Sequence, residues 1–193
     1  MERLIEIMNL MERTEMAIDI KVATWLYKFI KSHPSIQRTL DVGLGEGASA
    51  MTIMLATGLK HTAIDSLQFT KAGLTNIARF GFAEQLEILA GLSSLVLAEL
   101  RQSSRVFDLS FLDAGGRIDD LFVDFHFVSA MTTIGGFILI PDNDRPTVLK
   151  FINYLQTNRP DFQVLQDHKI SRITVVQKLS QEDLRHWGDF HDF

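Results

Sequence analysis

Short runs of apolar residues alternate along the chain with longer segments in which apolar residues recur at helical spacing. Runs of the first kind predict buried strands, and segments of the second kind predict amphipathic helices. Because parallel strands need a helical crossover, this alternation predicts an α/β fold with a doubly wound, mostly parallel sheet covered by helices on both faces. The expected strands are 38–43, 61–65, 85–90, 106–112, 136–140, 162–166 and 173–178. The expected helices are 1–11, 14–32, 48–57, 69–80, 93–101, 119–132 and a last one that begins at Pro146.

The last two strands differ from the others in their connection. Segments 162–166 and 173–178 are separated by too few residues for a crossover helix, so they should pair antiparallel and the last strand should oppose the rest of the sheet. A chain of 193 residues suits a single domain. We expect N-terminal helices over 1–34, a core over 36–180 and a solvated tail over 181–193.

Composition excludes several classes of protein. The chain has no cysteine, which removes disulfide frameworks and thiolate chemistry and favours a reducing compartment. Its net charge of −5 disfavours nucleic acid as the main partner, because a phosphate backbone calls for a basic surface. No apolar run is long enough to span a membrane, and the first residues do not read as a secretory signal. We therefore expect a cytoplasmic protein without a membrane partner.

The residues after the first predicted strand carry the strongest functional signal. Gly43, Gly45 and Gly47 follow its apolar run and precede a predicted helix. Glycine permits positive φ and lets a ligand approach backbone N–H groups, while the N-terminus of the next helix attracts a carboxylate. Asp65 closes the second predicted strand, where a carboxylate can accept hydrogen bonds from ribose hydroxyls. Since the spacing is G-x-G-x-G and not the G-x-G-x-x-G of dinucleotide sites, the pair predicts a nucleoside site of another kind.

Four short motifs resemble those of the class I S-adenosylmethionine-dependent methyltransferases, and most closely the catechol and caffeoyl-coenzyme A type of O-methyltransferase. They are Gly45–Ala50, Gly91–Ser93, Phe107–Asp113 and Asp142–Asn143, and the likeness covers residues 36–180. The resemblance implies a Rossmann-like sheet of seven strands with an antiparallel last strand. It also implies an enzyme that uses S-adenosylmethionine to methylate an oxygen of a small molecule.

The resemblance further implies a set of site residues. Asp113, Asp142 and Asn143 would form the catalytic site and coordinate a divalent cation that holds two neighbouring substrate oxygens. Two carboxylates and a carboxamide are oxygen donors, which suit Mg²⁺ or Ca²⁺ better than zinc. Such residues also end strands and begin helices, so the sequence leaves open whether they bind a metal. The residues that would bind the cofactor are Asp41, Gly43, Gly45, Gly47, Ser49, Asp65, Gly91, Ser93 and Asp113.

The chain departs from the resembled family at the expected base. The family places a lysine three residues after the acid that ends the fourth strand, whereas this chain has Gly116, followed by Arg117. A guanidinium stays protonated at ordinary pH, so Arg117 can hold an anion but is a poor base. The proton acceptor is therefore unassigned. His168 and Lys169, between the last two strands, are candidates to line the substrate pocket.

Three functions remain open at this stage. The leading one is a small-molecule O-methyltransferase assisted by a divalent cation. The second is a metal-independent methyltransferase, or a relative that binds S-adenosylmethionine without catalysis. The third is an NAD-dependent oxidoreductase, which the glycine spacing and the antiparallel last strand disfavour. The methyl acceptor is not identified, and the apolar N-terminal helices make a homodimer an additional expectation.

Overall fold

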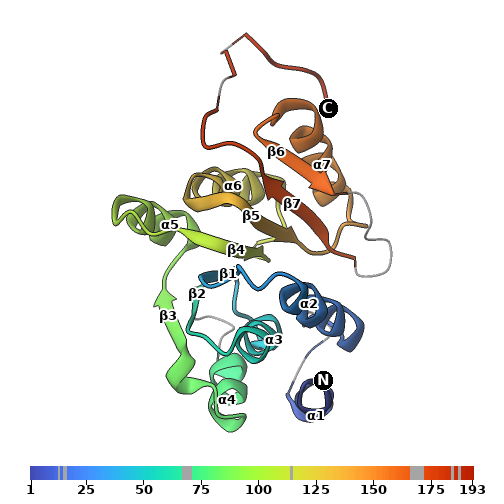
Figure 1. The fold of residues 1–193 in the computed structure, drawn as a ribbon, viewed down its shortest axis with the longest axis vertical. Helices are drawn as coiled ribbons and strands as arrows, with labels where there is room; N and C mark the ends of the chain where they lie inside the picture. Colours follow the sequence, from blue (N-terminus) through green and yellow to red (C-terminus); the bar gives the residue numbers. More distant parts are fainter. Residues whose placement is uncertain are drawn as a thin grey trace.

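A computed structural model describes residues 1–12, 14, 17–66, 71–113, 115–165, 172–183, 185–186 and 188–193. Its centre is a sheet of seven strands in the order β3-β2-β1-β4-β5-β7-β6 (Figure 1). Strands β1 to β5 pair in parallel, and β7 pairs antiparallel with both β5 and β6. The predicted reversal of the last strand is confirmed. The strands are β1 (Thr39–Val42), β2 (His61–Asp65), β3 (Leu86–Ala90), β4 (Phe107–Leu112), β5 (Thr132–Ile140), β6 (Phe162–Leu165) and β7 (Thr174–Lys178).

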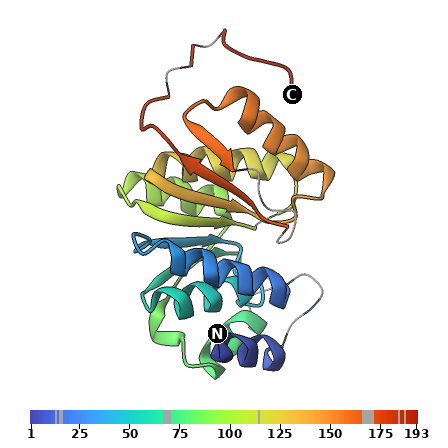
Figure 2. The same cartoon turned by 45° about the vertical axis from the view of Figure 1, so that its right-hand side comes forward.

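Helices cover both faces of the sheet and form a three-layer molecule, with the termini at opposite ends (Figure 2). One face is covered by α5, α6 and α7, whose apolar side chains share a core with Leu40 and Val42 of β1. The other face is covered by α1, α2, α3 and α4. The predicted doubly wound architecture is therefore confirmed. The helices are α1 (Glu2–Leu10), α2 (Ile20–Ser32), α3 (Ala48–Thr57), α4 (Lys71–Arg79), α5 (Ser93–Gln102), α6 (Ile118–Met131) and α7 (Pro146–Asn158), with a 3₁₀ turn over Ala83–Gln85.

The second helix starts later than the sequence predicts. The expected range was 14–32, but α2 begins at Ile20. Asp19 is its N-cap, and one carboxylate oxygen of Asp19 accepts hydrogen bonds from the backbone N–H groups of Lys21 and Val22 at 2.7 and 2.9 Å. An aspartate in this position satisfies the free N–H groups of the first turn and fixes the start of the helix. The start expected at residue 69 for the fourth helix lies outside the described residues, and α4 is described from Lys71.

Strand β5 is longer than expected. We predicted a strand over 136–140, but β5 runs over Thr132–Ile140 and follows α6 directly. Its pairing with β4 shifts register between Phe107 and Leu109. Gly135 and Gly136 therefore lie within an irregular part of the strand and do not end it, which is a common use of glycine in sheets.

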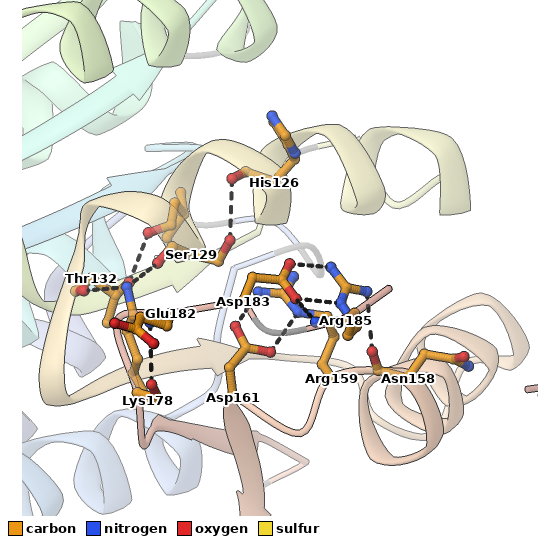
Figure 3. Close-up of polar contacts among 12 residues, drawn as sticks. His126, Ser129, Thr132, Asn158, Arg159, Asp161, Lys178, Glu182, Asp183 and Arg185 are labelled. Atoms are coloured by element: carbon orange, nitrogen blue, oxygen red, sulfur yellow. Dashed lines mark hydrogen bonds and ion pairs between the residues drawn. The ribbon is translucent and has the colours of Figure 1, made fainter. Parts of the chain in front are cut away.

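The described residues of the C-terminal tail are mostly exposed, as expected for a solvated tail, but hydrogen bonds tie them to α7. Asn158, at the end of α7, donates from its carboxamide to the His191 carbonyl at 2.9 Å and accepts from the His191 N–H at 2.8 Å. Arg185 donates to the Asn158 carbonyl and pairs with Asp183 (Figure 3). It also donates to the Tyr154 hydroxyl. Beside it, Arg159 and Asp161 form a buried bidentate ion pair.

Candidate functional site

The predicted site residues gather at one edge of the sheet. They lie at the carboxyl ends of four neighbouring strands. The glycine loop, residues 43–47, follows β1, Asp65 ends β2, and Gly91 and Asp113 follow β3 and β4. Strands β1 and β4 are neighbours, yet the helices that follow them cover opposite faces of the sheet. In a doubly wound sheet, such a switch point is where ligands bind. The topology therefore brings together side chains that are far apart in the sequence.

The glycine loop has the backbone that its sequence predicts. Gly43, Gly45 and Gly47 have φ angles of 99°, 49° and 81°, which lie in the region that favours glycine. The N–H of Gly43 donates to the Ile64 carbonyl at 2.9 Å, so the first residue of the loop is hydrogen-bonded to the neighbouring strand β2. Gly47 is the N-cap of α3. A Cβ built at Gly45 would meet no described atom within 4 Å, which leaves the loop open at this point.

Asp65 lies against this loop. One carboxylate oxygen of Asp65 accepts hydrogen bonds from the backbone N–H groups of Leu44 and Gly45 at 2.9 and 3.2 Å. The structure thus brings the two halves of the sequence motif into direct contact. Its N–H contacts also give Asp65 a role that the sequence did not suggest, because they hold the shape of the loop.

Asp41 occupies a buried position beneath the loop. The side chain is fully buried, and one oxygen accepts a 2.6 Å hydrogen bond from the Ser49 hydroxyl of α3. His61 Nε2 lies 3.6 Å from the same oxygen, and the other ring nitrogen of His61 is 2.8 Å from the Thr39 hydroxyl. Asp41 and Ser49 therefore link β1 to α3 beneath the loop, and their contact with the cofactor stays a prediction.

Two residues of α4, which the sequence analysis did not single out, complete the surroundings of the loop. A Cβ built at Gly73 would overlap the carbonyl oxygen of Gly45, so only glycine allows α4 to pack this closely. Asn76 is fully buried and donates from its carboxamide to the carbonyls of Glu12 and Glu46 at 2.7 and 3.1 Å. Asn76 therefore ties the N-terminal segment to the glycine loop. The sequence signal that could have identified these two residues is a glycine and an asparagine within a segment of helical periodicity.

Ser93 begins α5 close to β3. Its side chain lies near Asp124 of α6, a residue that is only 2% exposed and whose Oδ1 is buried without a hydrogen-bond partner. Burial raises the pKa of Asp124 to about 6 although the nearby Ser93 side chain lowers it, and the charge of Asp120 also raises it. Asp124 lies among Leu121, Phe125 and Val128, which are all buried. An acid in the apolar stripe of a helix was a sequence signal that could have identified it.

Asp113 and Asp142 lie near each other at the ends of β4 and β5. Burial among surrounding protein groups raises the pKa of Asp113 to about 7, although part of its surface reaches solvent. The negative charges of Asp142 and Asp41 also raise this pKa, and the positive charge of Arg145 lowers it. The predicted proximity of the two acids is therefore present in the structure.

Arginines surround Asp142. One of its carboxylate oxygens lies 2.7 Å from a guanidinium nitrogen of Arg145, and the other lies 3.0 Å from one of Arg172. Asn143 follows in the turn before α7, and its backbone N–H donates to the Arg172 carbonyl at 3.2 Å. In this arrangement both oxygens of Asp142 face guanidinium groups, so a divalent cation could bind Asp142 only by displacing them, and the predicted metal site stays a prediction.

Among the described residues, no group of three or more histidine, cysteine, aspartate or glutamate side chains could hold a metal ion. His168 and Lys169 lie outside the described residues. Within the described part of the chain, no helix combines the length and apolar character needed to cross a membrane.

Comparison with known proteins gives similarity at the level of structure. No protein-family model matches the sequence, and no curated protein matches it either. An O-methyltransferase from Bacillus cereus, solved with S-adenosylhomocysteine, is 15% identical with a TM-score of 0.74, and the match covers 92% of this chain and 91% of that one.

Two further solved methyltransferases match over most of their length. TomG from Streptomyces achromogenes, an O-methyltransferase of tomaymycin synthesis solved with S-adenosylmethionine, is 18% identical with a TM-score of 0.72, covering 93% of this chain and 91% of that one. The Podospora anserina methyltransferase PaMTH1, bound to S-adenosylhomocysteine, is 17% identical with a TM-score of 0.74, covering 93% and 87%. The chain therefore has the fold of class I S-adenosylmethionine-dependent methyltransferases.

Proposed function

We propose that this protein is an S-adenosylmethionine-dependent methyltransferase that acts on an oxygen atom of a small molecule. The observation that carries the proposal is the glycine loop at the switch point, fastened by Asp65 and lying at the same sheet edge as Asp113. The fold shared with the solved O-methyltransferases supports it.

The chain has the parts that an adenosyl cofactor requires. Gly45 is open on its outer side, so a ligand can approach the backbone there. Helix α3 begins directly after Gly47, and its N-terminus favours a carboxylate such as that of a methionine group. Asp65, which already holds the loop, is the candidate acceptor for ribose hydroxyls. Gly91 and Ser93, after β3, remain predicted contacts for the rest of the nucleoside.

The reaction would take place beside Asp113, where the strand ends present charged groups to solvent. When bound, the cofactor supplies a methyl group on a sulfonium: the acceptor oxygen forms a C–O bond while the C–S bond breaks, the electron pair stays on sulfur, and the hydroxyl proton is released to solvent. The residues around Asp113 would orient the acceptor oxygen, and such positioning is a large part of catalysis when no covalent intermediate is needed.

A divalent cation remains the second version of this proposal. Asp113, Asp142 and Asn143 supply the oxygen donors that Mg²⁺ or Ca²⁺ prefers. To coordinate such an ion, Asp142 would have to release both Arg145 and Arg172. We therefore derive no catalytic step through a metal.

Calorimetry with S-adenosylhomocysteine and with NAD tests the proposed cofactor. We expect saturable binding of S-adenosylhomocysteine and no comparable binding of NAD. Preferential binding of NAD would overturn the proposal and favour an oxidoreductase. Asp65→Ala is the matched variant, because it removes the loop acceptor and leaves the rest of the sheet edge intact.

A second experiment separates an enzyme from a relative that only binds the cofactor. The protein would be incubated with methyl-labelled S-adenosylmethionine and a panel of hydroxylated small molecules, including catechols and other phenols. Labelled product is expected from at least one acceptor. Cofactor binding without transfer to any member of a broad panel would favour the non-catalytic alternative.

A further inference from the structure

Arg145 is fixed at the sheet edge by the turn between β5 and α7. It is the N-cap residue of α7, and its backbone N–H donates to the Asp142 carbonyl at 2.9 Å. A guanidinium nitrogen of the same residue is 2.7 Å from a carboxylate oxygen of Asp142. The side chain is therefore folded back over the strand end from which its backbone departs.

The Arg145 guanidinium lies beside Gly116. A Cβ built at Gly116 would lie 3.7 Å from Nη1 of Arg145, so the arginine packs against the loop that follows β4. Gly116 also has a φ of 66°, a conformation that residues with side chains rarely adopt. The departure that the sequence showed at position 116 thus has a structural counterpart in Arg145.

The charge of Arg145 acts on both acids of the predicted metal site. It pairs with one carboxylate oxygen of Asp142 at 2.7 Å, and it lies close enough to Asp113 for the two charges to attract each other. Arg172 holds the other oxygen of Asp142 and also pairs with Asp144 at 2.9 Å. A positive charge is therefore already present where a divalent cation would have to bind.

We propose that the Arg145 guanidinium serves as the resident cation of this site, in the position that a divalent cation would otherwise take between Asp113 and Asp142. This inference rests on the proposed methyltransferase function for its catalytic meaning: the transfer would need no divalent metal. A guanidinium is permanently charged and offers several N–H donors, so it can hold an acceptor oxygen as negative charge develops on it.

Titration with Mn²⁺, followed by electron paramagnetic resonance, tests the proposal without relying on activity. The wild-type protein should show only weak binding of Mn²⁺. Arg145→Ala and Arg145→Gln both remove one of the two guanidinium groups that face Asp142, so we expect each to bind Mn²⁺ about fivefold more tightly, the factor that corresponds to an exposed ion pair of about 1 kcal/mol. The glutamine variant keeps a hydrogen-bonding side chain and so isolates the effect of charge.

Two further variants locate the effect. Adding Asp142→Asn to Arg145→Ala should abolish the gained binding. Arg117→Ala removes a highly exposed arginine that pairs with Asp119 at 3.5 Å and not with Asp142, so this variant should bind Mn²⁺ no better than the wild type. Equal binding of Mn²⁺ by the wild type and both Arg145 variants, whether tight or weak, would overturn the proposal.

Calorimetry with S-adenosylhomocysteine on each variant keeps this inference separate from the proposed function. Retained binding in Arg145→Ala shows that the variant is folded and that its cofactor loop is intact. If no form of the protein binds the nucleoside, the methyltransferase proposal fails, while the Mn²⁺ titration still decides the role of Arg145. If an acceptor is found, loss of wild-type turnover on treatment with a chelator would also contradict a resident guanidinium cation.

Discussion

Gly73 in α4 packs so closely on Gly45 that a Cβ at position 73 would overlap the Gly45 carbonyl oxygen. The helix and the glycine loop are therefore in backbone contact. Gly73 is buried, and its neighbour Asn76 holds the same loop through the Glu46 carbonyl. This contact makes the conformation of the loop depend on a helix that follows the next strand.

Replacing Gly73 by alanine should disturb this contact. Alanine gains roughly 0.5–1 kcal/mol of helix propensity, but overlap with a backbone carbonyl cannot be relieved by rotating a side chain. We expect a net loss of about 1–3 kcal/mol in the free energy of unfolding, together with weaker binding of S-adenosylhomocysteine. Urea unfolding and calorimetry measure the two effects.

Gly81→Ala is the control for this prediction. Gly81 lies just after the end of α4 and has a φ of 82°, but a Cβ built there would meet no described atom within 4 Å. It should lose about 1–2 kcal/mol from backbone strain and keep its affinity for the nucleoside. Equal loss of affinity in both variants would show that nucleoside binding does not depend on the contact between Gly73 and Gly45.

Asp65→Ala should loosen the glycine loop. The variant removes the acceptor of two backbone N–H groups, and hydrogen bonds to a charged group contribute about 1.5–3 kcal/mol each at most. We expect affinity for S-adenosylhomocysteine to fall by about tenfold or more, since the loop and the ribose would lose the same carboxylate. Asp65→Asn should lose less stability, because its carbonyl oxygen can still accept from the loop.

Calorimetry checks this prediction, with Glu84→Gln as a control. Glu84 is an exposed acid in the 3₁₀ turn before β3, so it changes the net charge by the same amount without touching the loop. Unchanged nucleoside affinity in Asp65→Ala would contradict the assignment of Asp65 to the cofactor site.

The sequence predicted the order of strands and helices because periodicity and turn residues are local signals. It also predicted the glycine loop and Asp65, since both belong to strand ends that a parallel sheet brings together. The buried place of Asp41 was less accessible to prediction. Alternation along β1 directs Leu40 and Val42 to one core and Asp41 to the other face, where Ser49 and His61 surround it.

Other features depend on packing between distant segments. Gly73 and Gly45 meet only because α4 returns over the loop, and no pattern within either segment reports that contact. The same holds for Arg145, whose position over Gly116 joins the ends of β4 and β5. The sequence showed the missing lysine at position 116, but it did not show which side chain would lie against that glycine.

Asp124→Asn should alter the pH dependence of stability. The pKa of Asp124 is raised from 3.8 to about 6 by burial, so the folded protein holds this proton more tightly than the unfolded chain. Its contribution to stability is fully present below pH 3.8 and is lost as the pH rises to about 6. The asparagine variant should therefore be more stable than the wild type at pH 8, by up to ~3 kcal/mol, and nearly equal to it near pH 4.

Unfolding in urea across this pH range measures the effect, and Asp119→Asn provides the control. Asp119 lies in the first turn of the same helix, but its side chain is 66% exposed. That control should keep the pH profile of the wild type. If the stability of Asp124→Asn depended on pH as that of the wild type does, the pKa of the buried Asp124 carboxyl group would not be raised as expected.

Asn158→Ala should release the C-terminal tail from α7. The side chain is 3% exposed and makes reciprocal hydrogen bonds with the backbone of His191, so its removal breaks both. The freed His191 groups can reach water, which limits the loss of stability to about 1–2 kcal/mol. The tail should open much more often, and chymotrypsin should then cleave faster at Phe190, which is already 60% exposed. Mass spectrometry of a timed digest measures this rate.

Asn153→Ala, at an exposed position on the same helix, should be cleaved like the wild type. Equal rates in all three proteins would show that the Asn158 contact does not hold the tail.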